Sequence, residues 1–580
     1  MEQYQASLEL PDAEQEAEIS STNPFLDPRI PTFADLLERV RQDSALKPNR
    51  RADLRSALTA FARLMRQEPA AMPALPATYR PRLRRLVPAN TGLSAKRLSN
   101  IRSEVLFCLR RYGALPRRNA LGPIGAGWRP LWDRLSMPQR AALSRFSRWA
   151  SARGIAPISV SDDALVAFRA DLEAESFVAN PDGIVASVCR VWTKLRAAQP
   201  DLALPPLAIP RRRETYVLAI EAFPVSFGTE LEAFCAHLGG VDLFAESGPP
   251  RPLKPVSVKR RRFQVLQLAS AIVHRGGPAA SITGLASLVE PPALRTALRF
   301  FVDRAGGGST TQISQLAFVA IMIAKHWARV DPEQLRIVQG IRGKVACRTR
   351  GMTEKNRERL RQFDDRLTLE RLLFYADDVL ADLAKRRDRS RKAALEAQVA
   401  VAVALLIAAP IRLSNLAALE LDVHLLRSRS GDDAVWHLVI PAHETKNREP
   451  HEVPLGQEVV RVLRIYLKDY RPLLADPASS FLFPSGKGHK ATNSLGTLLT
   501  ERVFRRTGIT INPHLFRHFS AKLILEETPG GYGIVQDVLR HRDMATTRGH
   551  YAGAEATAAA RHYDGVVRQQ RQRLRGEGQQ

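Results

Sequence analysis

Near the C-terminus of the chain, a tyrosine is surrounded in sequence by cationic and proton-carrying side chains. In the stretch HRDMATTRGHYAG, residues 541–553, His541 lies ten residues before Tyr551, and His550 immediately precedes the tyrosine. A tyrosine hydroxyl has a pKa of about 10, so it attacks a phosphodiester only beside a base or in a strongly cationic site. Tyr551 is therefore a core aromatic, a surface aromatic or a nucleophile, depending on the partners that the rest of the chain supplies.

Two arginines are candidates for binding a phosphate. Arg412 follows Pro410 at the edge of the apolar stretch AAPIRLSNLAALEL, where an unpaired charge is costly and needs an anion or a carboxylate. Arg517 lies three residues after His514 in NPHLFRHFSAKLIL, on a helix that Asn512 can cap and that is expected to start at the next residue, a proline. His514 and Arg517 would then be two donors on one face near a helix N-terminus, which suits the binding of a phosphate. For Arg412, an internal salt bridge is the alternative.

Three other residues carry weaker signals. Lys446, in ETKNREPHEVPL, is expected at the tip of a hairpin, where most lysines are simply solvated. His514 and His518 are spaced as a metal pair would be, but no third ligand lies at a suitable spacing and no glutamate occupies the second position of the run. We therefore expect no metal site. Core packing of either histidine remains an alternative to phosphate binding.

The order of these residues is more specific than any one of them. The phrases R-x-S-N-L, T-K-N…V-P-L, P-H-x-x-R-H and L-x-H-x-x-x-x-T-T-x-x-x-Y fall between about 355 and 565, and there the chain resembles the tyrosine recombinase (phage integrase) family. One departure is Arg540, which precedes the second histidine where the family often has glycine. The resemblance identifies Tyr551 as the nucleophile within a catalytic set of Arg412, Lys446, His514, Arg517, His541 and Tyr551.

The resemblance also implies how these residues act. Arg412 and Arg517 hold the non-bridging oxygens and stabilise the charge that develops in the transition state. His514 takes or orients the tyrosine proton, Lys446 protonates the leaving 5′ oxygen and His541 adds a hydrogen bond to the phosphate. The product is a 3′-phosphotyrosyl link with a free 5′ hydroxyl. Because the bond energy is kept, no ATP, metal or other cofactor is expected.

The charge of the whole chain favours a nucleic acid partner. Among its 580 residues, 86 are Lys or Arg and 59 are Asp or Glu, which gives a net charge of +27. Such a field attracts polyanions, and double-stranded DNA is the expected partner. The basic residues are clustered in four segments, 79–86, 210–214, 258–263 and 385–392. A solvated helix face would explain any single one of these clusters.

Other features bear on the compartment. The four cysteines lie far apart, with neither metal-ligand spacing nor a disulfide pattern. The first twenty residues are acidic and polar, unlike a signal peptide. The most apolar run, 397–411, is too short to span a bilayer. We expect a cytoplasmic, nucleoid-associated bacterial protein with no membrane partner.

The patterns predict a mainly α, multi-domain fold with a small antiparallel β-sheet, in which helical N-terminal DNA-binding modules precede a tyrosine recombinase catalytic domain. Strand-like runs at 434–455 predict the sheet. The N-terminal half is expected to contain an acidic leader (1–31), a helical segment (32–118), a helical module that resembles a core-binding module (119–215) and a core-binding-like domain (216–350). The catalytic domain (351–565) and a basic tail (566–580) are expected to follow.

These inferences together predict a site-specific DNA recombinase or integrase that integrates or excises a mobile element. By resemblance, it would work as a homo- or hetero-tetramer on synapsed DNA, with other recombinase subunits as further partners, and its C-terminal tail would exchange between subunits. One alternative is a type IB topoisomerase-like enzyme that relaxes DNA with the same residues. The other is a non-catalytic, architectural DNA-binding subunit that keeps the fold.

Overall fold

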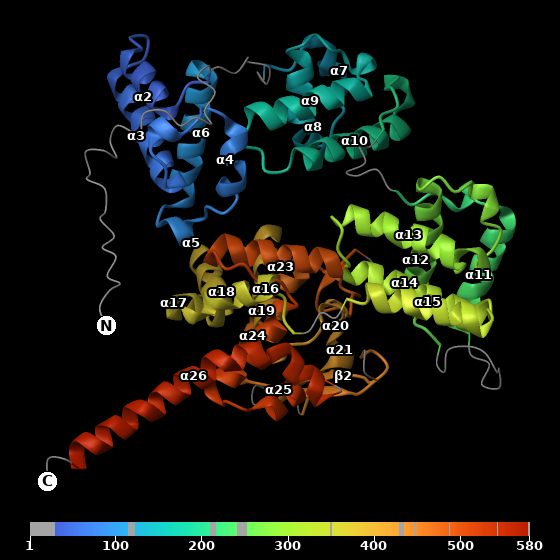
Figure 1. The fold of residues 1–580 in the computed structure, drawn as a ribbon. Helices are drawn as coiled ribbons and strands as arrows, with labels where there is room; N and C mark the ends of the chain where they lie inside the picture. Colours follow the sequence, from blue (N-terminus) through green and yellow to red (C-terminus); the bar gives the residue numbers. More distant parts are fainter. Residues whose placement is uncertain are drawn as a thin grey trace, which may run out of the picture. The chain divides into compact units, whose positions relative to one another are not determined.

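The computed structural model describes residues 30–577 except 114–121, 209–215, 241–251, 348–350, 429–433, 446–447, 487 and 542. The chain divides into two compact units, one formed by 211–351 and the other by 1–210 together with 352–580. Helices dominate both units, and the sheets lie in the C-terminal part of the chain (Figure 1). The predicted mainly α fold with a small antiparallel sheet is therefore confirmed.

Residues 30–113 form a helical bundle around the rings of Phe33, Phe61 and Tyr79, whose centres lie 5.4–5.5 Å apart. Its first helix begins with a capping box, in which Thr32 and Asp35 satisfy each other's backbone N–H groups. Proline at the first helical position starts three of the remaining helices. The helices are α2 (Phe33–Gln42), α3 (Pro48–Met65), α4 (Pro76–Leu83), α5 (Pro88–Thr91) and α6 (Ala95–Tyr112).

A second helical bundle follows and has its own aromatic core of Trp128, Phe146, Trp149, Phe168 and Trp192. It contains α7 (Arg129–Asp133), α8 (Met137–Ser151), α9 (Asp162–Glu175) and α10 (Pro181–Ala198). The unit formed by 211–351 is a third bundle with a separate core. Its helices are α11 (Val225–Gly239), α12 (Pro255–His274), α13 (Pro291–Arg304), α14 (Thr311–Met322) and α15 (Pro332–Val345).

The C-terminal part, from Met352 onward, packs around one large apolar core. Short 3₁₀ and π segments extend several of its helices. The helices are α16 (Glu354–Arg361), α17 (Arg366–Leu373), α18 (Tyr375–Arg386), α19 (Arg391–Ala408), α20 (Leu413–Ala417), α21 (Leu421–His424), α22 (Gln457–Ile465), α23 (Thr492–Thr507), α24 (Leu515–Glu527), α25 (Tyr532–Leu539) and α26 (Met544–Glu577).

The main sheet has three antiparallel strands in the order β1 (Leu425–Arg427), β2 (Trp436–Ile440) and β3 (His451–Leu455). Alternate residues of β2 are buried, as expected for a strand with one face on the core. Ile440 pairs with His451 at the end of the ladder, so the predicted β2–β3 hairpin is confirmed. Lys446, expected at the tip of this hairpin, lies outside the described residues. A second, two-stranded ladder joins β4 (Pro484–Ser485) to β5 (Gly488–His489).

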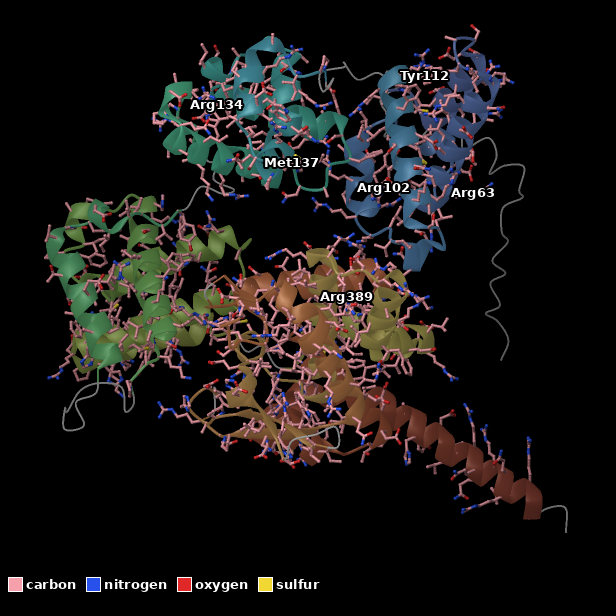
Figure 2. The ribbon with its side chains drawn as sticks, turned by 180° about the vertical axis from the view of Figure 1, so that it is seen from behind. Arg63, Arg102, Tyr112, Arg134, Met137 and Arg389 are labelled. Carbon is pink, nitrogen blue, oxygen red and sulfur yellow. The ribbon has the colours of Figure 1, made fainter. Side chains whose placement is uncertain are left out.

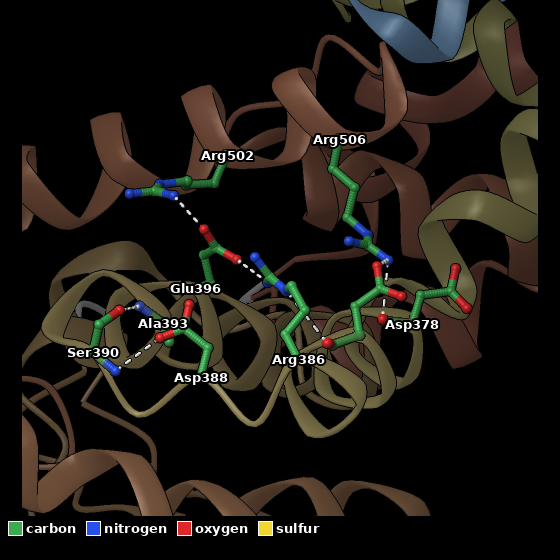
Figure 3. A network of polar contacts seen from close by, with 9 residues as sticks. Asp378, Arg386, Asp388, Ser390, Ala393, Glu396, Arg502 and Arg506 are labelled. Atoms are coloured by element: carbon green, nitrogen blue, oxygen red, sulfur yellow. Dashed lines mark hydrogen bonds and ion pairs between the residues drawn. The ribbon is translucent and has the colours of Figure 1, made fainter. Parts of the chain in front are cut away.

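The helix α19 is held at its N-terminal end by a network of polar contacts (Figure 3). Ser390 caps the helix by accepting a hydrogen bond from the backbone N–H of Ala393 at 3.2 Å. Glu396 accepts hydrogen bonds at 3.0 Å from both Arg386 of α18 and Arg502 of α23. Three helices are therefore linked through one carboxylate. Because α19 is buried over most of its length, this link fixes the position of its far end, from which the chain continues to Arg412.

The last helix, α26, runs without interruption from Met544 to Glu577. It begins against α24 and α25 and extends away from them toward the C-terminus (Figure 1). The boundary expected at 565 between the catalytic domain and a separate tail therefore falls inside one helix. Among the residues that the structure describes, none of the helices combines the length and apolar character needed to cross a membrane.

Candidate active site

Arg412 lies where the chain turns from the end of α19 into α20, and its side chain is half-buried. Burial lowers the pKa of its guanidinium. In the described part of the chain, no carboxylate forms an ion pair with Arg412. The internal salt bridge considered from the sequence is therefore not found there, and the guanidinium presents its charge to the small pocket beside it.

Arg517 lies on the first turn of α24, and only 6% of it is exposed. Its two terminal nitrogens donate hydrogen bonds to the backbone oxygens of Pro410, which follows α19, and Leu539, which ends α25. Carbonyl oxygens satisfy the donors but leave the positive charge in place. Burial, with a smaller contribution from Arg412, lowers the pKa of Arg517 to about 10, so the guanidinium is still charged at neutral pH.

The start of α24 differs slightly from the prediction. Asn512 accepts a hydrogen bond from the backbone N–H of Leu515 at 2.9 Å, so it caps the first turn as expected. The helix begins at Leu515, two residues later than the sequence predicted. His514 consequently lies just before the helix and is exposed, whereas Arg517 is directed into the domain.

Tyr551 lies on the second turn of α26 and is 2% exposed, so the surface-aromatic alternative is wrong. Burial raises the pKa of its hydroxyl to about 12, and the nearby charge of Arg517 partly opposes this shift. The ring of His518 meets the tyrosine ring edge-on at 5.5 Å between centres, and the ring of His541 lies parallel to it at 6.2 Å. The structure thus places one buried phenol beside one buried arginine and two imidazoles.

The two histidines of α24 form a short series of rings that leads to this phenol. The centre of the His514 ring lies 5.1 Å from that of His518, and His518 in turn contacts Tyr551. From the sequence, His518 was considered only as half of a metal pair or as a core residue. Its contact with Tyr551 could not be anticipated, because it depends on how α26 packs on α24. Among the described residues, no group of three potential metal ligands occurs.

His541 is held by a threonine of the following helix. Its Nδ1 lies 3.0 Å from the hydroxyl of Thr547, a residue with no exposed surface. Arg540, at the position where glycine was expected, has φ 48° and ψ 54°, which is the left-handed conformation that ends α25. An L-residue adopts this conformation at a cost of about 1–2 kcal/mol. The turn before His541 therefore forms even though glycine is absent.

Next to Arg412 and Arg517 is a pocket of about 30 Å³. Two residues that line it are not in the predicted catalytic set: His451, the first residue of β3, and Arg540. The strand register could have flagged His451, since it pairs with the buried Ile440. Lys446 is not described, but Thr445 and Glu449 on either side of it also line the pocket, and the backbone N–H of Glu449 donates a hydrogen bond to the Thr445 hydroxyl at 3.1 Å.

Residues 376–557, which contain all six predicted catalytic residues, match the model of the phage integrase family. This domain belongs to that family. Tyrosine recombinase XerC of Bifidobacterium longum subsp. infantis is 27% identical over 176 residues, which are 28% of this chain and 46% of that protein. Tyrosine recombinase XerC of Alcanivorax borkumensis is 29% identical over 165 residues, which are 28% of this chain and 50% of that protein.

The chain thus spans about half the length of the curated relatives it matches. Among solved structures, the post-cleavage complex of the XerH site-specific recombinase with a palindromic difH substrate aligns with 57% of this chain and 93% of that one, at 14% identity and a TM-score of 0.35. XerA recombinase aligns with 54% of this chain and 92% of that one, at 17% identity and a TM-score of 0.23. The phage integrase match is confined to the part of the chain that contains Tyr551.

Proposed function

We propose that this protein is a site-specific DNA recombinase that cuts and rejoins DNA strands through a 3′-phosphotyrosyl intermediate on Tyr551. The observation that carries the proposal is the position of Tyr551 within a phage integrase domain, buried beside Arg517 and between the rings of His518 and His541. A phenol in an apolar core has no need of such neighbours. A nucleophile that must lose its proton next to an anion needs both a cation and a proton acceptor.

In this mechanism, Arg412 and Arg517 bind the non-bridging oxygens of the scissile phosphate. The charge of Arg517 is already desolvated and held by backbone carbonyls, and Arg412 is half-buried, so little reorganisation is needed as charge develops in the transition state. The Tyr551 hydroxyl attacks phosphorus while the bond to the 5′ oxygen breaks, and Lys446 gives that oxygen a proton. Attack by a 5′ hydroxyl of another strand reverses the step and joins new partners.

The tyrosine proton requires an acceptor, because a hydroxyl whose pKa is about 12 is almost wholly protonated at neutral pH. His514 has this role in the proposed mechanism, and His518 lies between the rings of His514 and Tyr551. His541 donates a hydrogen bond to the phosphate from Nε2. For this it needs a proton on Nε2, and a hydrogen bond from the Thr547 hydroxyl to Nδ1 would select that tautomer.

The proposed substrate is double-stranded DNA in the bacterial cytoplasm, at the nucleoid, and the proposed biological role is the integration or excision of a mobile element. The net charge of +27 and the helical bundles outside the catalytic domain support extended contact with DNA. The working assembly would be a tetramer, with copies of this chain or related recombinase subunits on synapsed DNA.

The test is a trapping assay. The full-length protein is incubated with nicked suicide duplexes that cover the ends of its own genetic element, and covalent protein–DNA adducts are separated on a denaturing gel. We expect an adduct with the wild type and none with Tyr551→Phe. If the protein binds these duplexes and forms no adduct, the architectural alternative is favoured. Relaxation of a supercoiled plasmid that lacks any target site would favour the topoisomerase alternative.

A further inference from the structure

The small pocket beside Arg412 and Arg517 contains a histidine to which the family resemblance assigns no role. His451 opens β3, is 7% exposed, and lines this pocket. Its Nε2 is buried, and none of the residues that the structure describes forms a hydrogen bond with it. Buried polar atoms nearly always have partners in native proteins, so an exception calls for an explanation such as a bound group that belongs there.

The charges around His451 show what kind of group this would be. The pocket brings together three guanidiniums, from Arg412 before α20, Arg517 on α24 and Arg540 after α25. Among the described residues that line it, Glu449 is the only one with a carboxylate, and its side chain is exposed. Burial and the charges of these three arginines lower the pKa of His451 to about 4. A neutral imidazole with an N–H donor therefore faces an excess of positive charge.

The size of the pocket limits which part of an anion can enter. Its volume of about 30 Å³ is only a few times the minimum of about 10 Å³ that a cavity needs to hold one water molecule. It can take one oxygen of a phosphate but not a nucleotide. Arg540 lines the pocket with a side chain at the position where the family often has glycine. It does so although its backbone adopts the left-handed conformation that favours glycine.

We propose that His451 is a further ligand of the scissile phosphate and donates a hydrogen bond from Nε2 to one non-bridging oxygen. The identity of the phosphate rests on the proposed function. His451 would thus be a catalytic residue in addition to the six that the family resemblance identifies. The binding of an anion would offset the field of the three arginines and raise the pKa of the His451 imidazole.

The first test measures single-turnover cleavage of the suicide duplex by the full-length protein. His451→Leu keeps an apolar side chain of similar bulk and removes the donor, and we expect cleavage to slow by about 10²-fold, the usual cost of losing one preorganised donor. His451→Gln keeps an N–H donor and should lose less. His437→Leu is the matched control, because His437 lies on the neighbouring strand β2 outside this pocket, and its cleavage rate should match the wild type.

A modified substrate separates binding from folding effects. In a methylphosphonate at the scissile position, a methyl group replaces one non-bridging oxygen. In one of its two stereoisomers, the methyl group replaces the oxygen that His451 would bind. The wild type and His451→Leu should cleave this stereoisomer at nearly the same rate, by the logic of a double-mutant cycle. If His451→Leu is slowed equally on the phosphate and on both stereoisomers, the residue acts structurally and the proposal is overturned.

A second measurement does not depend on cleavage. The histidines of the full-length protein are labelled with ¹³C at Cε1, the His451 signal is identified by its loss in the variant, and inorganic phosphate is the probe. We expect a pKa near 4 without phosphate and a higher one with it. A His451 signal that phosphate leaves unmoved would overturn the proposal even if the enzyme cleaves DNA. Absence of a Tyr551-dependent adduct together with a phosphate-induced shift would instead reject the proposed function and keep the anion site.

Discussion

The arginines of the pocket and those of two surface clusters, 258–263 and 385–392, are of one residue type but have different kinds of partner. In the clusters, many guanidiniums already have protein partners. Arg262 pairs with Glu232 at 2.7 Å and Arg386 with Glu396 at 3.0 Å. Arg389, labelled in Figure 2, pairs with Asp469 at 3.3 Å and lies 4.9 Å from the centre of the Tyr470 ring. In the pocket, the hydrogen-bond partners of Arg517 among the described residues are backbone carbonyls.

This difference shows that a count of basic residues overstates the number available to DNA. An exposed arginine that already faces a carboxylate gains little from a phosphate, since one ion pair replaces another in water. A buried arginine held by carbonyls gains more, because its charge is desolvated in advance and still uncompensated. The contrast holds for the clusters at 258–263 and 385–392, because the cluster at 210–214 lies outside the described residues. In the cluster at 79–86, Arg80 and Arg82 donate to backbone carbonyls, as Arg517 does.

Arg517→Lys tests the pocket side of this comparison and should have the largest effect. Lysine keeps the charge but cannot form the two hydrogen bonds that join Pro410 to Leu539 while also facing a phosphate. We expect suicide-substrate cleavage to fall by about 10³-fold or more. The surface counterpart, Arg389→Lys, should cleave at the wild-type rate. Comparable losses in the two variants would remove the distinction between the regions.

The pH dependence of stability should reveal the cationic pocket without DNA. The folded pKa of His451, about 4, lies below its ordinary value of 6.5, so the unfolded chain takes up this proton first as the pH falls. The stabilisation is therefore complete above pH 6.5 and is lost toward pH 4, by up to about 3 kcal/mol. Denaturant unfolding at both pH values checks this prediction. His451→Leu should not show this part of the loss of stability at acid pH. If the variant and the wild type lost stability equally between pH 6.5 and pH 4, the prediction would be contradicted.

Thr547→Val should have a smaller effect that is confined to catalysis. Valine has the shape of threonine but cannot hydrogen-bond to Nδ1 of His541, which lies 3.0 Å from the threonine hydroxyl. We expect cleavage to slow by about 10-fold, the low end of effects for a lost positioning hydrogen bond, with DNA affinity unchanged. Thr547→Ser should restore most of the rate. Full activity of Thr547→Val would show that His541 needs no such support.

Arg386→Ala tests the surface side and should have the smallest effect. Arg386 is half exposed, and Glu396 keeps its second partner, Arg502. We expect the free energy of unfolding to fall by less than about 1 kcal/mol, as for other exposed ion pairs. DNA binding measured across a salt series should weaken slightly for all sequences alike. A selective loss of target-site binding would mean that this cluster reads DNA directly.

The sequence predicted features that depend on neighbouring residues. The β2–β3 hairpin followed from alternating strand-like runs, and the Asn512 cap followed from a polar residue placed before an amphipathic segment. The order of the six candidate residues was enough to identify the family of the domain, which the match to 376–557 confirms. Each of these signals lies within a short stretch of the chain.

The remaining features depend on contacts between distant segments. Arg517 bonds to a carbonyl 107 residues away, and no local pattern reports such a partner. His451 appears in sequence as one more strand residue, and only the packing of β3 against the turns after α19 and α25 makes it a wall of the pocket. The carboxylate partners of the cluster arginines were hidden for the same reason.

The two carbonyl bonds of Arg517 have a consequence for how the domain could lose activity. One of them ends on Leu539, the last residue of α25, and α26 with Tyr551 follows after a short turn. If α25 and α26 detached together by local unfolding, Tyr551 would leave the site and Arg517 would lose one of its two carbonyl partners in the same event. Cleavage competence should therefore be all-or-none, and hydrogen exchange at the amides of α25 would report it directly.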